Sequence, residues 1–336
     1  MLAVTLFWTF WGTLEMYHEG WWGSGPGRLL YLAPASTCTV LALLGQRWPL
    51  VGGCALIGAS LWFTAWWLPL SVARGSELGD LAVRLAIAGT PAAVGTLFLL
   101  EARRRRGSAA PPASRWIVRH LGSVLSVVAP VLMLLGISAV RLPTVLSRFD
   151  DGDRGAKVIA GPDGPLVWAP EGPGWSAGAG EGRDWRCYPS WNRLALYGME
   201  PVGLGDKPDR PEGPATMAEM QRYGLFRYLD ADGTTLHDVP VDVWRMPTVR
   251  DLVGCLVRDG VGVGATWHGD VGRATFTTEP DKETPLWAPD RSPIYYWALD
   301  DTGATDAFYV SYNGWVGKQP KSFGNSRHGF RFIRSP

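Results

Sequence analysis

Residues 120–141, HLGSVLSVVAPVLMLLGISAVR, form a nearly continuous apolar stretch that ends where the character of the chain changes. A membrane-spanning helix needs about 20 mostly apolar residues, and this stretch has that length. Beyond Leu142 no comparable stretch occurs, and the chain becomes polar, rich in glycine, proline and tryptophan, with frequent turn signals. The sequence therefore predicts a membrane region followed by a single polar domain.

Four further apolar stretches precede residues 120–141. Between Leu29 and Ala73 the only formal charge is Arg47, in a tight Gln-Arg-Trp-Pro turn that is typical of a membrane hairpin. The first stretch is the weakest, because its apolar run stops at Leu14 and a span requires the helix to continue through His18. The expected spans, about five in all, are residues 2–22, 29–46, 49–70, 79–100 and 120–141.

The distribution of arginine predicts how these helices are oriented. Arg103–Arg106 follow the fourth stretch, and Arg115 and Arg119 precede the fifth. Loops rich in Arg and Lys remain on the cytoplasmic side. We therefore expect a multi-pass protein of the cytoplasmic membrane, with a cytoplasmic N-terminus and residues 142–336 outside, in the periplasm or the extracellular space. The N-terminus lacks the basic region and cleavage motif of a signal peptide, so we expect it to be retained.

Charge and motif spacing narrow the possible partners. The net charge of +1 argues against a nucleic-acid partner held by electrostatics. Glu15, His18 and Glu19 form half of a carboxylate-rich di-metal motif, but no other expected span supplies the second half. These three residues are weak metal candidates. The favoured interpretation is that they form a polar collar at the membrane surface and pair with Arg28. The lipid bilayer is the expected partner of this region, and we expect no metal and no cofactor.

The polar part divides into a juxtamembrane linker over residues 142–165 and a domain over residues 166–336. Within the linker, Asp150–Gly155 resembles a calcium loop but lacks its ligand spacing and closing Glu, which favours a turn.

Capping and turn motifs predict the elements of the domain. Thr216 with Glu219 is a capping box before a helix over residues 217–229, and Thr248 with Asp251 begins a second helix that stops at Gly260. Asn313-Gly314 is a hairpin turn signal. Short aromatic strands are expected at residues 295–299, 307–312 and 329–334. The predicted fold class is therefore an all-α membrane region of about five helices plus an α+β domain.

Several of these motifs together resemble the DUF1566 (Lcl C-terminal) family. Residues 244–252, WRMPTVRDL, match its helix start, and residues 295–297, 307–310 and 329–334 follow in that family's order, over about residues 216–334. The resemblance implies a C-type-lectin-like domain of the formylglycine-generating-enzyme kind, generally extracytoplasmic and often adhesive or glycan-binding. Relatives commonly have a cysteine where this chain has Phe332. A contact between Phe332 and Phe226 is expected to replace their disulfide.

The cysteines and histidines argue against catalysis. Formylglycine-generating enzymes need reactive cysteines late in the domain, and no cysteine follows Cys255. Cys187 and Cys255 are the candidates for one disulfide in an oxidising compartment. A Ser326/His328/Asp arrangement lacks supporting context. His237, His268 and His328 are scattered without metal-ligand spacing and are expected at the surface.

Aromatic and polar side chains late in the chain are the candidates for ligand binding. Aromatic rings stack on sugar faces, and Asn, Lys and Arg bind hydroxyls or anions. The competing interpretation is that the strand aromatics fill the core, whereas Trp315 and Lys318 are expected to be exposed. The candidate residues are Trp287, Tyr295, Trp297, Tyr309, Tyr312, Asn313, Trp315, Lys318, Lys321, Arg327 and Arg331.

Three functions remain open at this point. The leading hypothesis is a membrane-anchored binding or docking module that recognises glycan, envelope material or a partner protein without catalysis. The first alternative is an accessory structural subunit of a larger membrane complex, since small residues such as Gly52, Gly53, Gly58 and Gly89 permit close helix packing. The second alternative is an enzyme with a site in the outer domain.

Overall fold

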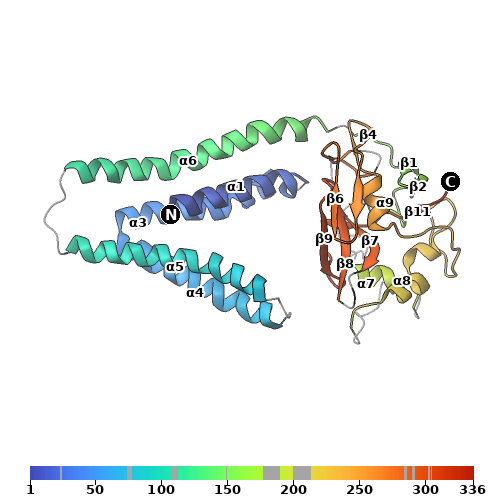
Figure 1. Cartoon of the computed structure of the whole chain (residues 1–336), viewed down its shortest axis with the longest axis horizontal. Helices are drawn as coiled ribbons and strands as arrows, with labels where there is room; N and C mark the ends of the chain where they lie inside the picture. Colours follow the sequence, from blue (N-terminus) through green and yellow to red (C-terminus); the bar gives the residue numbers. More distant parts are fainter. Residues whose placement is uncertain are drawn as a thin grey trace. The chain divides into compact units, whose positions relative to one another are not determined.

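The structure is a computed structural model, and its described residues fall into two compact units, Met1–Leu146 and Ser147–Pro336. The first unit is built of helices, and the second of short helices and short strands (Figure 1). The structure describes residues 1–22, 25–73, 78–106, 113–148, 150–176, 190–199, 213–283, 286–289, 292–301, 303 and 305–336.

Among the described residues, the N-terminal unit contains four helices that are long and apolar enough to cross a membrane. They cover Gly25–Arg47, Pro49–Pro69, Leu81–Arg106 and His120–Leu146. The last four expected stretches are therefore confirmed as helices of sufficient length and apolar composition. The helical elements are α1 (Leu2–His18), η1 (Gly20–Trp22), α2 (Gly25–Leu29), η2 (Leu30–Leu32), α3 (Ala33–Arg47), α4 (Pro49–Ala73), α5 (Leu78–Arg106) and α6 (Ala113–Leu146). Helix α1 covers the first expected stretch but has only 17 residues, so it is not among the four.

Small residues allow these helices to pack closely against one another. A Cβ atom on Gly53 of α4 would lie 2.8 Å from the carbonyl oxygen of Gly95 of α5, and Ser60 Oγ donates to the Ala88 carbonyl at 2.5 Å. Gly53, one of the small residues named under the alternative of a larger membrane complex, therefore serves close packing within the chain. Gly58 and Gly89 have open space around their Cα atoms.

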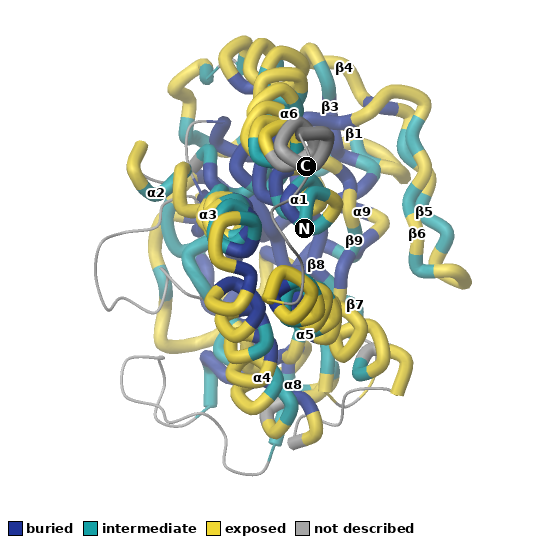
Figure 2. Tube along the Cα trace, turned by 90° about the vertical axis from the view of Figure 1, so that its left-hand side faces the viewer, coloured by how far each residue is buried: buried dark blue, intermediate teal, exposed yellow. Residues whose placement is uncertain are grey.

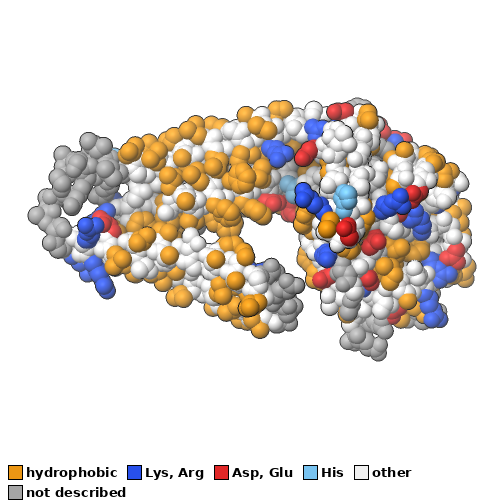
Figure 3. Space-filling view, in the orientation of Figure 1, with side chains coloured by type: hydrophobic (Ala, Val, Ile, Leu, Met, Phe, Trp, Pro, Cys, Tyr) orange, Lys and Arg blue, Asp and Glu red, His pale blue; other side chains and the backbone are white. Residues whose placement is uncertain are grey.

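Apolar side chains cover the surface of this unit. Leu61, Trp62 and Val140 are 64%, 70% and 71% exposed, and exposed positions dominate α4, α5 and α6 in Figure 2. The same helices are covered by hydrophobic atoms in the space-filling view (Figure 3). A surface of this kind is favourable against lipid tails and costly in water.

In the part of the C-terminal unit that the structure describes, the strands form four small sheets. Their strand orders are β1-β2-β11, β10-β7-β8-β9, β3-β4 and β5-β6. The helices are α7 (Trp191–Ala195), α8 (Met217–Tyr223), η4 (Leu225–Tyr228) and α9 (Val249–Gly254). The strands are β1 (Lys157–Gly161), β2 (Gly164–Trp168), β3 (Val257–Arg258), β4 (Val261–Gly262), β5 (Thr266–His268), β6 (Arg273–Thr275), β7 (Tyr295–Asp301), β8 (Asp306–Ser311), β9 (Val316–Pro320), β10 (His328–Gly329) and β11 (Ile333–Arg334).

The described residues of 142–165, a range expected as a linker, include regular helix and strand. Helix α6 continues to Leu146, and strand β1 and the start of β2 also lie in this range. Arg148 donates from Nε and Nη2 to the buried Asp281 Oδ1 at 2.9 and 2.6 Å, which fixes the start of the unit to its interior. In the turn that resembles a calcium loop, Asp153 pairs with Lys157 at 2.5 Å, so a cation of the chain itself neutralises that carboxylate.

Both predicted capping boxes are confirmed, but the helices that they begin are shorter than expected. Thr216 and Glu219 cap α8, and Thr248 and Asp251 cap α9. Gly224 adopts extended ψ 141° and ends α8. After α9 the valine-rich continuation pairs as β3 with β4, because β-branched residues favour a ladder over a marginal helix.

The late strands agree in part with the expectation. Strands β7 and β8 lie where predicted, and Gly314 at φ +82° forms the predicted turn into β9. The third expected strand, residues 329–334, splits into β10, parallel to β7, and β11, antiparallel to β2. The rings of Phe226 and Phe332 meet edge to face at 5.7 Å, as predicted.

Candidate functional site

The eleven candidate residues do not form one surface. Seven of them are buried, namely Trp287, Tyr295, Trp297, Tyr309, Tyr312, Lys321 and Arg331. Arg327 is half-buried, and Asn313, Trp315 and Lys318 are exposed. The core interpretation of the strand aromatics therefore agrees with their burial, and the expected exposure of Trp315 and Lys318 is confirmed.

Arg331 is a structural side chain in the interior. Its Nε donates to the Ala169 carbonyl at 2.9 Å, and its Nη1 donates to the Leu286 carbonyl at 3.0 Å. The guanidinium lies 3.7 Å from the centre of the Trp175 ring, a cation–π contact. Burial lowers the pKa of Arg331 to about 10, so it remains a cation at neutral pH. It holds β2 and neighbouring loops together and does not reach solvent.

Lys321 has a similar structural role after β9. Its Nζ donates to the carbonyls of Ala215 and Gly303 at 2.7 and 3.0 Å and to Asp301 Oδ2 at 2.9 Å. The ammonium also lies 4.6 Å from the Trp191 ring centre. Three acceptors match the three donors of an ammonium, so none remains for a ligand.

Three other candidates contact residues of the same unit. Trp287 stacks on Tyr296 at 4.6 Å, and the guanidinium of Arg148 lies 5.0 Å from the Tyr312 ring. Arg327 Nη1 donates to Ser292 Oγ at 3.4 Å. Trp287 and Tyr312 belong to the interior in this structure.

His328, expected at the surface, is instead buried among aromatic rings. Its ring centre lies 5.0 Å from that of Tyr295, 5.1 Å from Trp297, 5.4 Å from Tyr309 and 5.3 Å from Phe323. The surface expectation was wrong because β10 pairs with β7, which places His328 beside Tyr295. We call His328, Tyr295, Trp297 and Tyr309 the His328 cluster.

Hydrogen bonds define the protonation of His328. Asn325 Oδ1 accepts from the Arg327 backbone N–H at 2.8 Å and lies 2.9 Å from His328 Nδ1. Since this oxygen is an acceptor, Nδ1 carries the proton and Nε2 carries the lone pair. Burial lowers the pKa of His328 to about 3, so the ring is neutral at physiological pH. It can accept a hydrogen bond at Nε2 but cannot act as a general acid there.

Two further polar groups lie on the same face of the sheet as His328. Ser311 is paired with Tyr295, and Gln319 is two residues from Gly317, the partner of Tyr309. Directly opposed residues point to the same face. His328 Nε2, Ser311 Oγ and Gln319 Oε1 are buried without a hydrogen-bond partner among the described residues.

Buried polar atoms usually have a partner, often an ordered water. Each of these atoms is therefore a position where an ordered water would be held. Gln319 lies apart from the other two, because its partner on β8 is Ala307, four residues from Ser311. The alternation Tyr309-x-Ser311 was the sequence signal that could have placed Ser311 on this face.

The exposed side of the cluster is formed by Trp315. This residue follows the β8–β9 turn, is 55% exposed, and meets the Tyr309 ring edge to face at 5.4 Å. Gly317 permits this contact, since a Cβ there would lie 2.5 Å from Tyr309 and 2.8 Å from Trp315. Asn313 is exposed beside it, and its Oδ1 accepts from the Trp315 N–H at 3.3 Å. Trp315 is thus a braced aromatic platform on the surface.

Lys318 lies on the opposite face of the sheet. Its neighbour across the strands is Phe308, whose ring centre is 5.2 Å from Lys318 Nζ. Trp267 meets Phe308 edge to face at 6.1 Å. Lys318 and Trp315 therefore do not contribute to one site.

The remaining site expectations concern cysteines and metals. Cys255 is a buried free thiol, and burial raises its pKa to about 12. Since Cys255 is free, the expected disulfide is absent from this structure; Cys187 itself lies outside the described residues. Across the described ranges no three His, Cys, Asp or Glu side chains gather as a metal site, and this includes Glu15, His18 and Glu19.

Searches against protein-family models, curated proteins and solved structures find no match to this chain.

Proposed function

We propose that the C-terminal unit is a non-catalytic binding module, displayed outside the cytoplasmic membrane, that recognises a glycan or envelope polymer through Trp315. The observation that carries this proposal is the exposed Trp315 ring braced by the buried Tyr309. A fixed ring loses little entropy when it stacks on a sugar face. Asn313 supplies an adjacent amide for hydroxyl groups.

Two sequence features support this proposal. The arginines at 103–106 support the outward orientation of the unit. The resemblance to the DUF1566 family favours a C-type-lectin-like domain with an adhesive role. The neutral state of His328 favours binding over acid–base chemistry, because a general acid or base works best with a pKa near the operating pH.

Replacing Trp315 by alanine is expected to weaken polymer binding about tenfold, the usual loss when an aromatic anchor is removed. The measurement is sedimentation of the full-length chain, in nanodiscs, with a polysaccharide fraction of the envelope. Val261→Ala, which shortens an exposed apolar side chain of β4, is the control and should bind normally. The proposal fails if the unaltered protein does not sediment with the polymer, or if Trp315→Ala binds equally well.

A second candidate function is docking on another subunit of a membrane complex. Val239, Val241 and Val243 are 67%, 38% and 38% exposed at alternate positions. Exposed apolar groups that cluster in this way often mark a protein interface. If this candidate is correct, the chain purifies in mild detergent as a stable hetero-complex, and Val239→Lys together with Val243→Lys releases the partner. Purification of the chain alone would count against it.

A further inference from the structure

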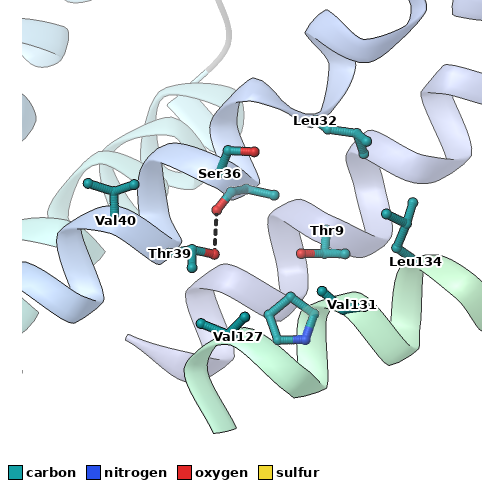
Figure 4. A pocket seen from close by; sticks show the side chains of 10 residues that line it. Thr9, Leu32, Ser36, Thr39, Val40, Val127, Val131 and Leu134 are labelled. Atoms are coloured by element: carbon teal, nitrogen blue, oxygen red, sulfur yellow. Dashed lines mark hydrogen bonds between the residues drawn. The ribbon is translucent and has the colours of Figure 1, made fainter. Parts of the chain in front are cut away.

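A groove lies within the N-terminal unit between α1, α3 and α6 (Figure 4). Its volume is about 310 Å³, and residues such as Thr9, Leu32, Thr39, Val127 and Leu134 line it. The hydroxyl groups of its threonines are already bonded, since Thr9 donates to the Thr5 carbonyl at 2.8 Å and Thr39 to the Ala35 carbonyl at 3.0 Å. Because neither hydroxyl needs a partner, the groove suits an apolar occupant.

The length of the groove indicates whether its occupant is a lipid chain or a partner helix. Its lining on the α3 side runs from Leu32 to Val40, which corresponds to about 12 Å at the helical rise of 1.5 Å per residue. One leaflet of the hydrocarbon core is about 15 Å deep, whereas a spanning helix needs about 30 Å. The groove therefore fits one acyl chain of a single leaflet better than a helix.

A polar collar adjoins one end of this groove. The apolar cluster of Met16, Tyr17 and Val145 packs against Trp21 and Tyr31 and also against Leu32 and Leu134, which line the groove. The groove and the collar therefore share one packing cluster.

The collar contains one cation and two carboxylates. The Arg28 guanidinium lies 4.4 Å from the Trp21 ring centre, and its buried Nε has no hydrogen-bond partner in the described part of the chain. The expected pairing of Arg28 with the acidic collar residues is absent from the ion pairs of the described residues. Tyr31 donates to Glu19 at 3.3 Å, and Glu15 of α1 lies four residues before Glu19, the C-cap of that helix.

We propose that the groove and the collar together bind one phospholipid with an amine-bearing, zwitterionic headgroup. One acyl chain occupies the groove, the phosphate bonds Arg28, and the ammonium lies toward Glu15 and Glu19. Guanidinium–phosphate hydrogen bonds are strong because both groups are charged. A headgroup without an amine would meet repulsion from the two carboxylates, whereas a zwitterion complements both signs of charge.

The experiment uses the full-length chain reconstituted with equal amounts of phosphatidylethanolamine and phosphatidylglycerol, then released into detergent for native mass spectrometry. We expect one retained lipid per chain, with phosphatidylethanolamine at least several-fold enriched over phosphatidylglycerol. The proposal would be overturned if the chain retained the two lipids in their bulk ratio, or retained phosphatidylglycerol alone.

Two pairs of variants locate the site. Arg28→Gln is expected to reduce retention about tenfold, as loss of a charge-assisted hydrogen bond does, whereas Arg47→Gln should not. Thr39→Leu fills the groove and is expected to abolish retention. Thr96→Leu is its control, because Thr96 is exposed and also donates to the carbonyl four residues earlier. If Arg28→Gln and Thr39→Leu both fold and retain lipid like the parent, the site is wrongly assigned.

Discussion

Replacing Arg331 by alanine is expected to lower the free energy of unfolding of the C-terminal unit by about 3–5 kcal/mol. Arg331 is fully buried and donates to the carbonyls of Ala169, Leu286 and Gly155. A buried acceptor that loses its donor costs about 1–3 kcal/mol, and the space left beside Trp175 adds a cavity cost. Removing the guanidinium also removes the cost of burying its charge, and this gain offsets part of the loss.

Hydrogen exchange of the full-length chain measures this effect, because amides of β2 and β11 report the opening of the unit. Arg334→Ala is the matched control from the same segment. Arg334 is only half-buried and donates to the neighbouring Ser335 carbonyl at 3.1 Å, so its loss should cost less than about 1 kcal/mol. Arg331→Met keeps much of the volume and should fall between the two. Equal protection in all three variants would contradict the structural role of Arg331.

Features set by neighbouring residues were predictable from the sequence. The apolar stretches follow from composition over about 20 residues. The weak first stretch, whose apolar run stops at Leu14, corresponds to α1, which ends at His18 after 17 residues. The capping boxes at Thr216 and Thr248 and the turn at Asn313-Gly314 each depend on two to four residues. These local structures could therefore be predicted without knowledge of the rest of the fold.

Features set by distant residues were not predictable in the same way. Arg331 is buried because Ala169, 162 positions away, offers its carbonyl, and no local pattern reveals this. His328 is buried because a two-residue strand pairs in parallel with β7. The candidate list therefore mixed structural cations, such as Lys321, with surface residues, such as Trp315, because composition alone does not separate the two.

The C-terminal unit is expected to lose about 1.4 kcal/mol of stability per pH unit through His328 as the pH falls below 6.5. Burial lowers the pKa of His328 in the folded chain to about 3, whereas the ordinary value is 6.5. Between these values the unfolded chain binds a proton that the folded chain does not. Stability is therefore complete above pH 6.5 and decreases toward pH 3, by about 4–5 kcal/mol in total.

His328→Phe tests this origin, because phenylalanine fills the ring's place among Tyr295, Trp297 and Tyr309 but does not titrate. Exchange protection of β7 and β8 is compared at pH 7.5 and pH 5.0 in the parent and the variant, after correction for the intrinsic exchange rate. The difference in free energy of unfolding between parent and variant should change by about 2 kcal/mol, because pH 5.0 lies 1.5 pH units below the ordinary pKa of 6.5. Carboxylates titrate in both chains and cancel in this difference. An unchanged difference would mean that His328 is protonated in the folded chain, and that a water or ligand reaches its Nε2.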